Sequence, residues 1–177
     1  MDNPADALEA EKATLAIAEH QGPCYLRLAR EPSPVFTTAK TPFKIGHANV
    51  LRQGRDVALV ACGPLVWHTL RAAEELTRQG IDAMVINMHT IKPLDEAVVL
   101  KAATGCSAIV TVEEHQVAGG LGGAIAEYLG RKKPTPMEFV GVNDRFGESG
   151  QPQELLERYG LGVKDIMVAA KKVLKRK

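Results

Sequence analysis

The stretch VALVACGPLVWHTLRAAEELTRQGIDAMVIN, residues 57–87, carries the pattern from which the fold is predicted. It begins with an apolar run at 57–61, continues as a helical pattern from about 65 to 79, and ends with a second apolar run at 83–87. Continuously apolar strands that are separated by a helix are typical of a parallel sheet covered on both faces. The stretch therefore predicts a strand–helix–strand unit with a right-handed crossover.

The alternation of strands and helices continues along the rest of the chain. Two further strands are predicted, at 108–112 and 137–142. Four further helices are predicted, from Asp95 to before Gly105, from the glycine stretch 119–123 to about Leu129, from Pro152 onward, and over 165–174. This order of elements indicates one α/β domain.

One strand is expected to run against the others. Residues 45–50 and the strand at 57–61 are separated by a turn at Gln53-Gly54, which predicts a hairpin. We therefore expect an α/β fold with a mostly parallel open sheet, one antiparallel strand and helices on both faces.

The N-terminal residues form a separate piece of the pattern. A helix that starts at Asp6 is followed by a short strand at Cys24–Leu28 and a proline-stiffened connector at 31–42. A helix and a strand cannot enclose a core, so they must pack on the main domain or on residues outside this sequence. We predict a boundary near residue 42, with residues 1–42 as one unit and residues 43–177 as the main domain.

Composition excludes several classes of function. The net charge of +1 gives no general reason to expect nucleic acid or a membrane as partner, and the basic residues 171–177 read as a solvated last helical turn. Three scattered cysteines and five scattered histidines suggest neither a disulfide framework nor a metal site. With neither a signal peptide nor a run of about 20 apolar residues, we expect a cytoplasmic protein.

One predicted strand end combines titratable side chains with glycines. Glu113, Glu114 and His115 lead into the glycine stretch 119–123, which opens a helix. Helix-start amides can bind a phosphate, but this spacing matches neither the dinucleotide fingerprint nor a Walker loop. We favour a structural interpretation, in which the glycines allow the helix to approach the sheet or a partner subunit closely.

Two arginines bracket the end of the strand at Cys24–Leu28. Arg27 and Arg30 precede the proline-stiffened connector, and a guanidinium held there could grip a phosphate through two parallel hydrogen bonds. From the residues alone, an ion pair with a carboxylate is supported at least as well as phosphate binding.

Taken together, four phrases resemble landmarks of the transketolase family, in the family's order. They are GPCYLRLAR (22–30), TIKPLD (90–95), VTVEEH (110–115) followed by GGLG (119–122), and SGQP (149–152) followed by ELL (154–156) and YGL (159–161). The first resembles the last strand of the family's pyrimidine-binding domain, and the others resemble its C-terminal domain. The resemblance implies that residues 1–42 end the former and residues 43–177 form the latter.

The resemblance also implies a function for the complete enzyme. Transketolases of the pentose phosphate pathway move a two-carbon ketol unit between sugar phosphates with thiamine diphosphate and a divalent cation such as Mg²⁺. The activating glutamate and catalytic histidines would lie upstream of Met1, so we expect no catalytic, cofactor-binding or metal-binding residue here and an inactive isolated chain. Arg30 alone matches a family functional residue, the arginine that binds the sugar's phosphate, and Arg27 would support it.

The expected partners follow from the same resemblance: upstream transketolase domains, in the same chain or in a separate subunit, and a second copy in a homodimer. The alternative within the superfamily is the C-terminal region of 1-deoxyxylulose-5-phosphate synthase. The beta subunit of a 2-oxo acid dehydrogenase fits less well, because its substrates carry no phosphate for Arg30. A non-catalytic assembly or anion-sensing module is the alternative from another class.

Overall fold

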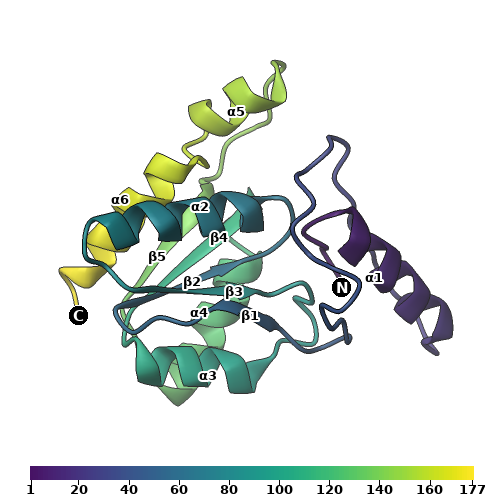
Figure 1. The fold of residues 1–177 in the computed structure, drawn as a ribbon, viewed down its shortest axis with the longest axis horizontal. Coiled ribbons are helices and arrows are strands. Elements are labelled where there is room, and N and C mark those ends of the chain that lie inside the picture. The colour runs from purple at the N-terminus through teal and green to yellow at the C-terminus, as the bar shows by residue number, and fades with distance from the viewer.

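The computed structural model describes residues 1–177 and contains a five-stranded sheet in the order β1-β3-β2-β4-β5 (Figure 1). The strands are β1 (Asn49–Arg52), β2 (Val57–Ala61), β3 (Ala83–Asn87), β4 (Ile109–Gln116) and β5 (Met137–Val142). β1 runs antiparallel to β3, and every other pairing is parallel. The predicted fold class is confirmed.

The predicted hairpin is wrong, because β1 pairs with β3 and not with β2. β2 is buried along its whole length and takes β3 and β4 as its two parallel neighbours. The turn after β1 crosses the start of β3 so closely that a Cβ on Gly54 would lie 2.2 Å from the carbonyl carbon of Ala83. The turn therefore carries the chain across β3 to the centre of the sheet.

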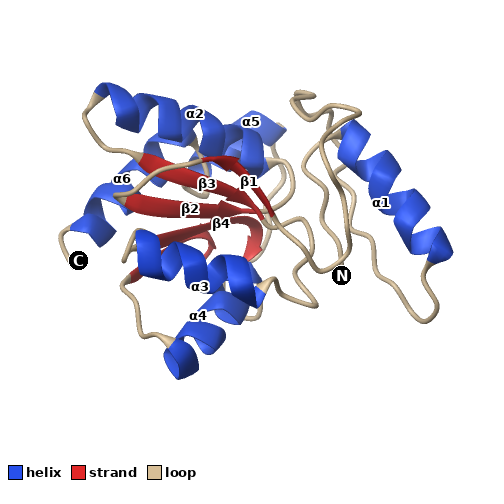
Figure 2. Cartoon of the chain, turned by 60° about the horizontal axis from the view of Figure 1, so that its bottom comes forward, coloured by secondary structure: helices blue, strands red, loops and turns tan.

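Helices cover both faces of the sheet (Figure 2). α2 (Leu65–Arg78) and α6 (Val163–Leu174) lie on one face, and α3 (Glu96–Gly105) and α4 (Leu121–Lys132) lie on the other. Successive residues of a strand point to opposite faces, so Leu59 packs in the α2 and α6 layer and Val60 packs in the α3 and α4 layer. Two buried apolar layers hold the domain together.

The N-terminal residues lie beside the sheet (Figure 1), and Ala5 and the partly buried Phe36 reach the core layer under α2 and α6. α1 (Ala7–Glu19) begins at its N-cap Asp6, as predicted, and buries only Glu9 and Ala13. The strand predicted at Cys24–Leu28 is wrong, because the segment forms a single bridge from Leu26 to Asp2. Asp2 also forms a bridge to Thr90, and neither bridge extends into a ladder. The boundary near residue 42 stays a prediction.

Two elements differ from expectation near the C-terminal half. β4 continues through Glu113 and His115, which were expected in a loop. α5 (Pro152–Arg158) begins at the predicted proline but buries no residue, and it extends away from the body of the molecule (Figure 1).

None of the helices has the length and apolar character needed to cross a membrane.

Candidate functional site

The carboxyl ends of β2 and β3 are covered by the first residues of the chain. Asn3 donates its N–H to the carbonyl of His89 at 2.8 Å and accepts the N–H of Gly63 at 3.0 Å. The hydroxyl of Thr90 donates to Asp2 Oδ1 at 2.6 Å. Ligands of open parallel sheets usually bind at this edge. In this protein the chain's own N-terminal segment occupies that position.

The side chain of Asn3 completes this cover. Gly63 has a φ of +63°, and a Cβ there would lie 2.8 Å from the Asn3 side chain. Asn3 Nδ2 also donates to Cys62 Sγ at 3.4 Å. Burial raises the pKa of the Cys62 thiol to about 12, which keeps it protonated and unsuited to act as a nucleophile.

The glycine stretch binds a carboxylate of its own chain. Glu113, only 2% exposed, accepts the N–H groups of Leu121 at 2.7 Å and Gly122 at 2.8 Å. Burial raises the pKa of Glu113, and the two N–H groups oppose that rise. A Cβ on Gly120 would lie 2.0 Å from Glu113 Oε2, so the glycine is needed for this approach. This geometry supports the structural interpretation of the glycines.

The same geometry tests whether a diphosphate would fit here. The oxygens of Glu113 already accept the two N–H groups at the start of α4, so its side chain occupies the position that a phosphate oxygen would need. The helix start therefore does not fit the diphosphate of a thiamine cofactor. His115 Nδ1 lies 2.8 Å from the carbonyl of Gln116 and 4.0 Å from Glu113.

A buried polar cluster joins α1 to the end of β3. Asn87 Nδ2 donates to both carboxylate oxygens of Glu9, at 2.8 and 3.0 Å, and Ala5 N–H donates to Glu9 Oε2 at 2.7 Å. Burial raises the pKa of Glu9. Sequence reasoning missed this cluster, although Asp6 with Glu9 three residues later has the spacing of a capping box.

His89 is the other buried titratable group of this region. Its ring stacks on Phe43 with centroids 4.3 Å apart, and its Nδ1 lies 3.3 Å from Thr90 Oγ1. Its Nε2 has no hydrogen-bond partner. Burial lowers the pKa of His89 to about 4, so the ring is neutral at physiological pH.

The two arginines, which are close in the sequence, differ in exposure and in their contacts. Arg27 is half-buried and donates its backbone N–H to the Asp2 carbonyl at 2.9 Å. Burial raises the pKa of Glu113, and the charge of Arg27 is one of the smaller effects that oppose this rise. Arg30 is 94% exposed, and its ion pair is with Glu31 at 3.4 Å. An exposed pair of this kind is weak, so the Arg30 guanidinium is available to an anion.

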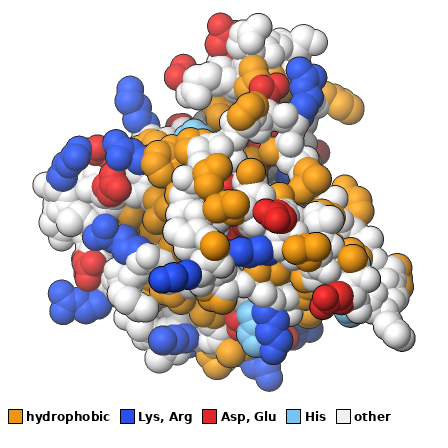
Figure 3. Space-filling model, turned by 45° about the vertical axis from the view of Figure 1, so that its right-hand side comes forward, with side chains coloured by type: hydrophobic (Ala, Val, Ile, Leu, Met, Phe, Trp, Pro, Cys, Tyr) orange, Lys and Arg blue, Asp and Glu red, His pale blue; other side chains and the backbone are white.

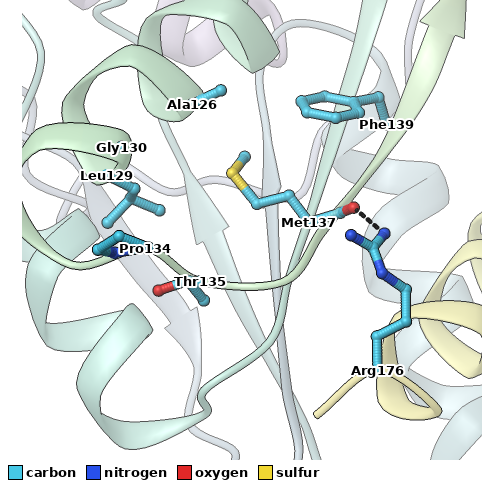
Figure 4. A pocket seen from close by; sticks show the side chains of 8 residues that line it. All are labelled: Ala126, Leu129, Gly130, Pro134, Thr135, Met137, Phe139 and Arg176. Carbon is cyan, nitrogen blue, oxygen red and sulfur yellow. Dashed lines mark hydrogen bonds between the residues drawn. The ribbon is translucent and has the colours of Figure 1, made fainter.

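Two cavities lie elsewhere, between α4 and β5. The first, of about 280 Å³, is lined by Leu129, Met137, Phe139 and Arg176, and Arg176 donates to the Met137 carbonyl at 2.8 Å (Figure 4). The second shares Ala126 and Phe139 with it. Neither cavity brings together the acid, base and nucleophile that catalysis needs.

A comparison with protein families agrees with this fold and its motifs. The family model of the transketolase C-terminal domain matches residues 46–166. The chain belongs to the transketolase family. A 6-deoxy-6-sulfo-D-fructose transketolase subunit of Clostridium sp. is 45% identical over 174 residues, which are 98% of this chain and 54% of the relative. An apulose-4-phosphate transketolase subunit of Phocaeicola vulgatus is 34% identical, with 98% and 55% of the two chains covered.

A solved structure resembles this member of the transketolase family closely. It is described as a split gene transketolase in an inactive beta4 tetramer, and it matches with a TM-score of 0.95 and 42% identity. The match covers 98% of this chain and 57% of the solved chain. The chain thus spans about half the length of the curated and solved relatives described here.

Proposed function

We propose that this chain is the C-terminal portion of a thiamine-diphosphate-dependent transketolase that transfers a two-carbon ketol unit between sugar phosphates. Within the complete enzyme it supports assembly and supplies Arg30, which binds the substrate phosphate. The cofactor and its divalent cation are bound by parts of the enzyme beyond these residues. The isolated chain is inactive in this proposal.

The observation that carries the proposal is the state of Arg30. Its guanidinium is 94% exposed and meets only the exposed carboxylate of Glu31. A guanidinium offers several donors in a planar fork that matches the oxygens of a phosphate. Family membership, together with an arginine whose ion pair is exposed and therefore weak, supports phosphate binding over a structural ion pair.

The names of the relatives suggest which anionic groups of a sugar Arg30 could bind. One relative is named for a sulfo sugar and another for a sugar phosphate. Sulfonate and phosphate groups both present oxygens to a guanidinium. We propose that Arg30 serves a terminal anion of the sugar, with phosphate as the principal group.

The proposal predicts a selective defect in the variant Arg30→Ala, assayed in the assembled enzyme. Loss of a charge-assisted hydrogen-bonding partner costs about 1.5–3 kcal/mol, so KM for phosphorylated sugars should rise about 10- to 150-fold. The phosphate is remote from the reacting carbons, so kcat should fall less. Steady-state kinetics with a phosphorylated sugar and with a non-phosphorylated donor such as hydroxypyruvate measure the contrast.

Arg30→Lys is the matched control, because it restores charge without the planar fork and should recover part of the loss. Equal losses with both kinds of substrate, in a variant that remains folded, would show that Arg30 is structural.

The alternative enzyme, 1-deoxyxylulose-5-phosphate synthase, would use Arg30 in the same way. Formation of 1-deoxyxylulose 5-phosphate by the assembled enzyme would favour it. The assembly or anion-sensing alternative would be favoured if every combination with transketolase subunits lacked activity while the chain still associated.

Assembly with other subunits or domains is supported by the surface of the N-terminal segment. Leu15, Tyr25, Leu28 and Val35 are each more than half exposed. Apolar side chains spread across the face that carries this segment, between scattered charges (Figure 3). Such a surface suits burial against the rest of the enzyme and against a second copy in a homodimer.

A further inference from the structure

The loop that carries Arg30 has no apolar burial to hold it. It runs from Leu28 to Val35, and every residue of it except the half-buried Ser33 is exposed. Ser33 donates to the Ala5 carbonyl at 3.2 Å. A loop without a buried side chain takes its position mainly from the hydrogen bonds at its two ends.

The upstream end of the loop is held by Asp2. Asp2 donates its backbone N–H to the Tyr25 carbonyl and accepts the N–H of Arg27, both at 2.9 Å. Its side chain accepts the hydroxyl of Thr90 at 2.6 Å. The sheet domain is thereby connected to the residues immediately before the loop.

The downstream end is held by the Asp6 side chain, which is 4% exposed. Asp6 Oδ2 accepts the N–H groups of Phe36 at 2.9 Å and Thr37 at 2.7 Å. Asp6 Oδ1 accepts the Thr37 hydroxyl at 2.7 Å and the N–H of Glu9 at 3.0 Å, the latter as the N-cap of α1. Burial by itself raises the pKa of Asp6, but the hydrogen bonds from Thr37, Glu9 and Phe36 together outweigh it and lower the pKa, which keeps the carboxylate ionised.

The two oxygens of Asp6 therefore have different sets of partners. Oδ1 caps helix α1 and also accepts the Thr37 hydroxyl, whereas Oδ2 accepts only backbone N–H groups at the end of the Arg30 loop, about 30 residues away. A serine could supply the cap alone. The second oxygen has a role that capping does not explain.

We infer that Asp6 is a positioning residue for Arg30, because its carboxylate holds Phe36 and Thr37 and so sets where the Arg30 loop lies. The inference rests on the proposed function of Arg30. It extends that function by adding a residue that touches no substrate. Guanidinium recognition of a phosphate requires correct placement, and a displacement of about 1 Å can cost up to about 100-fold in rate.

The test is Asp6→Ser in the assembled enzyme, since serine keeps the N-cap and removes the second oxygen. We expect KM for a phosphorylated sugar to rise about 5- to 50-fold, with KM for hydroxypyruvate and kcat nearly unchanged. In the Arg30→Ala background the same change should raise KM no further, because residues that act through one contact are not additive.

Asp95→Ser is the matched control. Asp95 is also an N-cap, with Oδ1 accepting Val98 N–H at 3.1 Å and Oδ2 accepting the N–H of Ala48, from a distant segment, at 2.9 Å. The Asp95→Ser variant should lose about as much stability as Asp6→Ser, but its KM for the phosphorylated sugar should stay unchanged. Hydrogen exchange of the Phe36 and Thr37 amides, measured on the chain itself, should accelerate in Asp6→Ser only.

Each outcome decides something. If Arg30→Ala raises KM and Asp6→Ser does not, positioning by Asp6 is overturned and the proposed function stands. If neither variant raises KM, both the proposed function of Arg30 and its positioning by Asp6 are overturned. A fully additive double variant, or unchanged exchange at Phe36 and Thr37, also overturns the inference. Should Asp6→Ser fail to fold, Thr37→Val removes only the hydroxyl bond to Asp6 and should raise KM in the same direction, less strongly.

Discussion

At the scale of single residues, His89 couples stability to pH. Its pKa is lowered from about 6.5 to about 4 by burial, so the unfolded chain binds a proton in this range and the folded chain does not. The contribution of His89 to the free energy of unfolding is therefore fully present above about pH 6.5, and it is lost as the pH falls toward about 4. The loss from this one group should reach about 3 kcal/mol.

Urea unfolding of the chain at about pH 7.5 and about pH 4.5 measures the effect. His89→Gln removes the titration, so the free energy of unfolding should differ less between the two conditions than in the unchanged protein. The same difference in both proteins would refute a buried, neutral His89.

At the scale of elements, α4 contains two glycines with opposite requirements. A Cβ on Gly120, at its N-cap, would lie 2.0 Å from Glu113 Oε2 and 2.7 Å from the Gln116 carbonyl, whereas a Cβ on Gly130 would meet nothing within 4 Å. Gly120→Ala should therefore destabilise the chain by about 1–3 kcal/mol, since the carboxylate must leave the helix start. Gly130→Ala should stabilise it by about 0.5–1 kcal/mol.

The midpoints of thermal and urea unfolding compare the two variants. Equal effects would mean that Glu113 does not occupy the start of α4. A smaller loss for Gly120→Ala in a Glu113→Ala background would identify the carboxylate as the obstacle.

At the scale of the whole molecule, the exposed apolar side chains of the N-terminal segment predict self-association. Leu15 on α1 and Val168 on α6 are matched helical positions, 62% and 64% exposed. If the N-terminal face is the one that associates, Leu15→Asp should weaken the dimer about tenfold or more, and Val168→Asp should not. Analytical ultracentrifugation over a concentration series measures this, and a strictly monomeric protein at high concentration would contradict it.

Much of the molecule could be predicted from the sequence by itself. Apolar runs and helical periodicity are local patterns, so β2, β3 and β5 lie within the predicted ranges and α1 begins at Asp6 as predicted. The role of Arg30, which the family motifs suggested, stays a prediction; its side chain is exposed and its ion pair is with Glu31. These features depend on residues that are near one another along the chain.

Only the tertiary structure decided which partners these elements take. β1 pairs with β3 because β3 and β4 already take the two sides of the buried β2. The local sequence around β1 and β2 does not show which strand will pair with which. Glu113 fills the start of α4, and Asp6 holds residues about 30 positions away, through hydrogen bonds that exist only once the segments are packed. The type of a side chain indicates that it can cap or bind. Which donors reach it is decided by the fold, because burial and long-range approach determine which polar groups must find a partner.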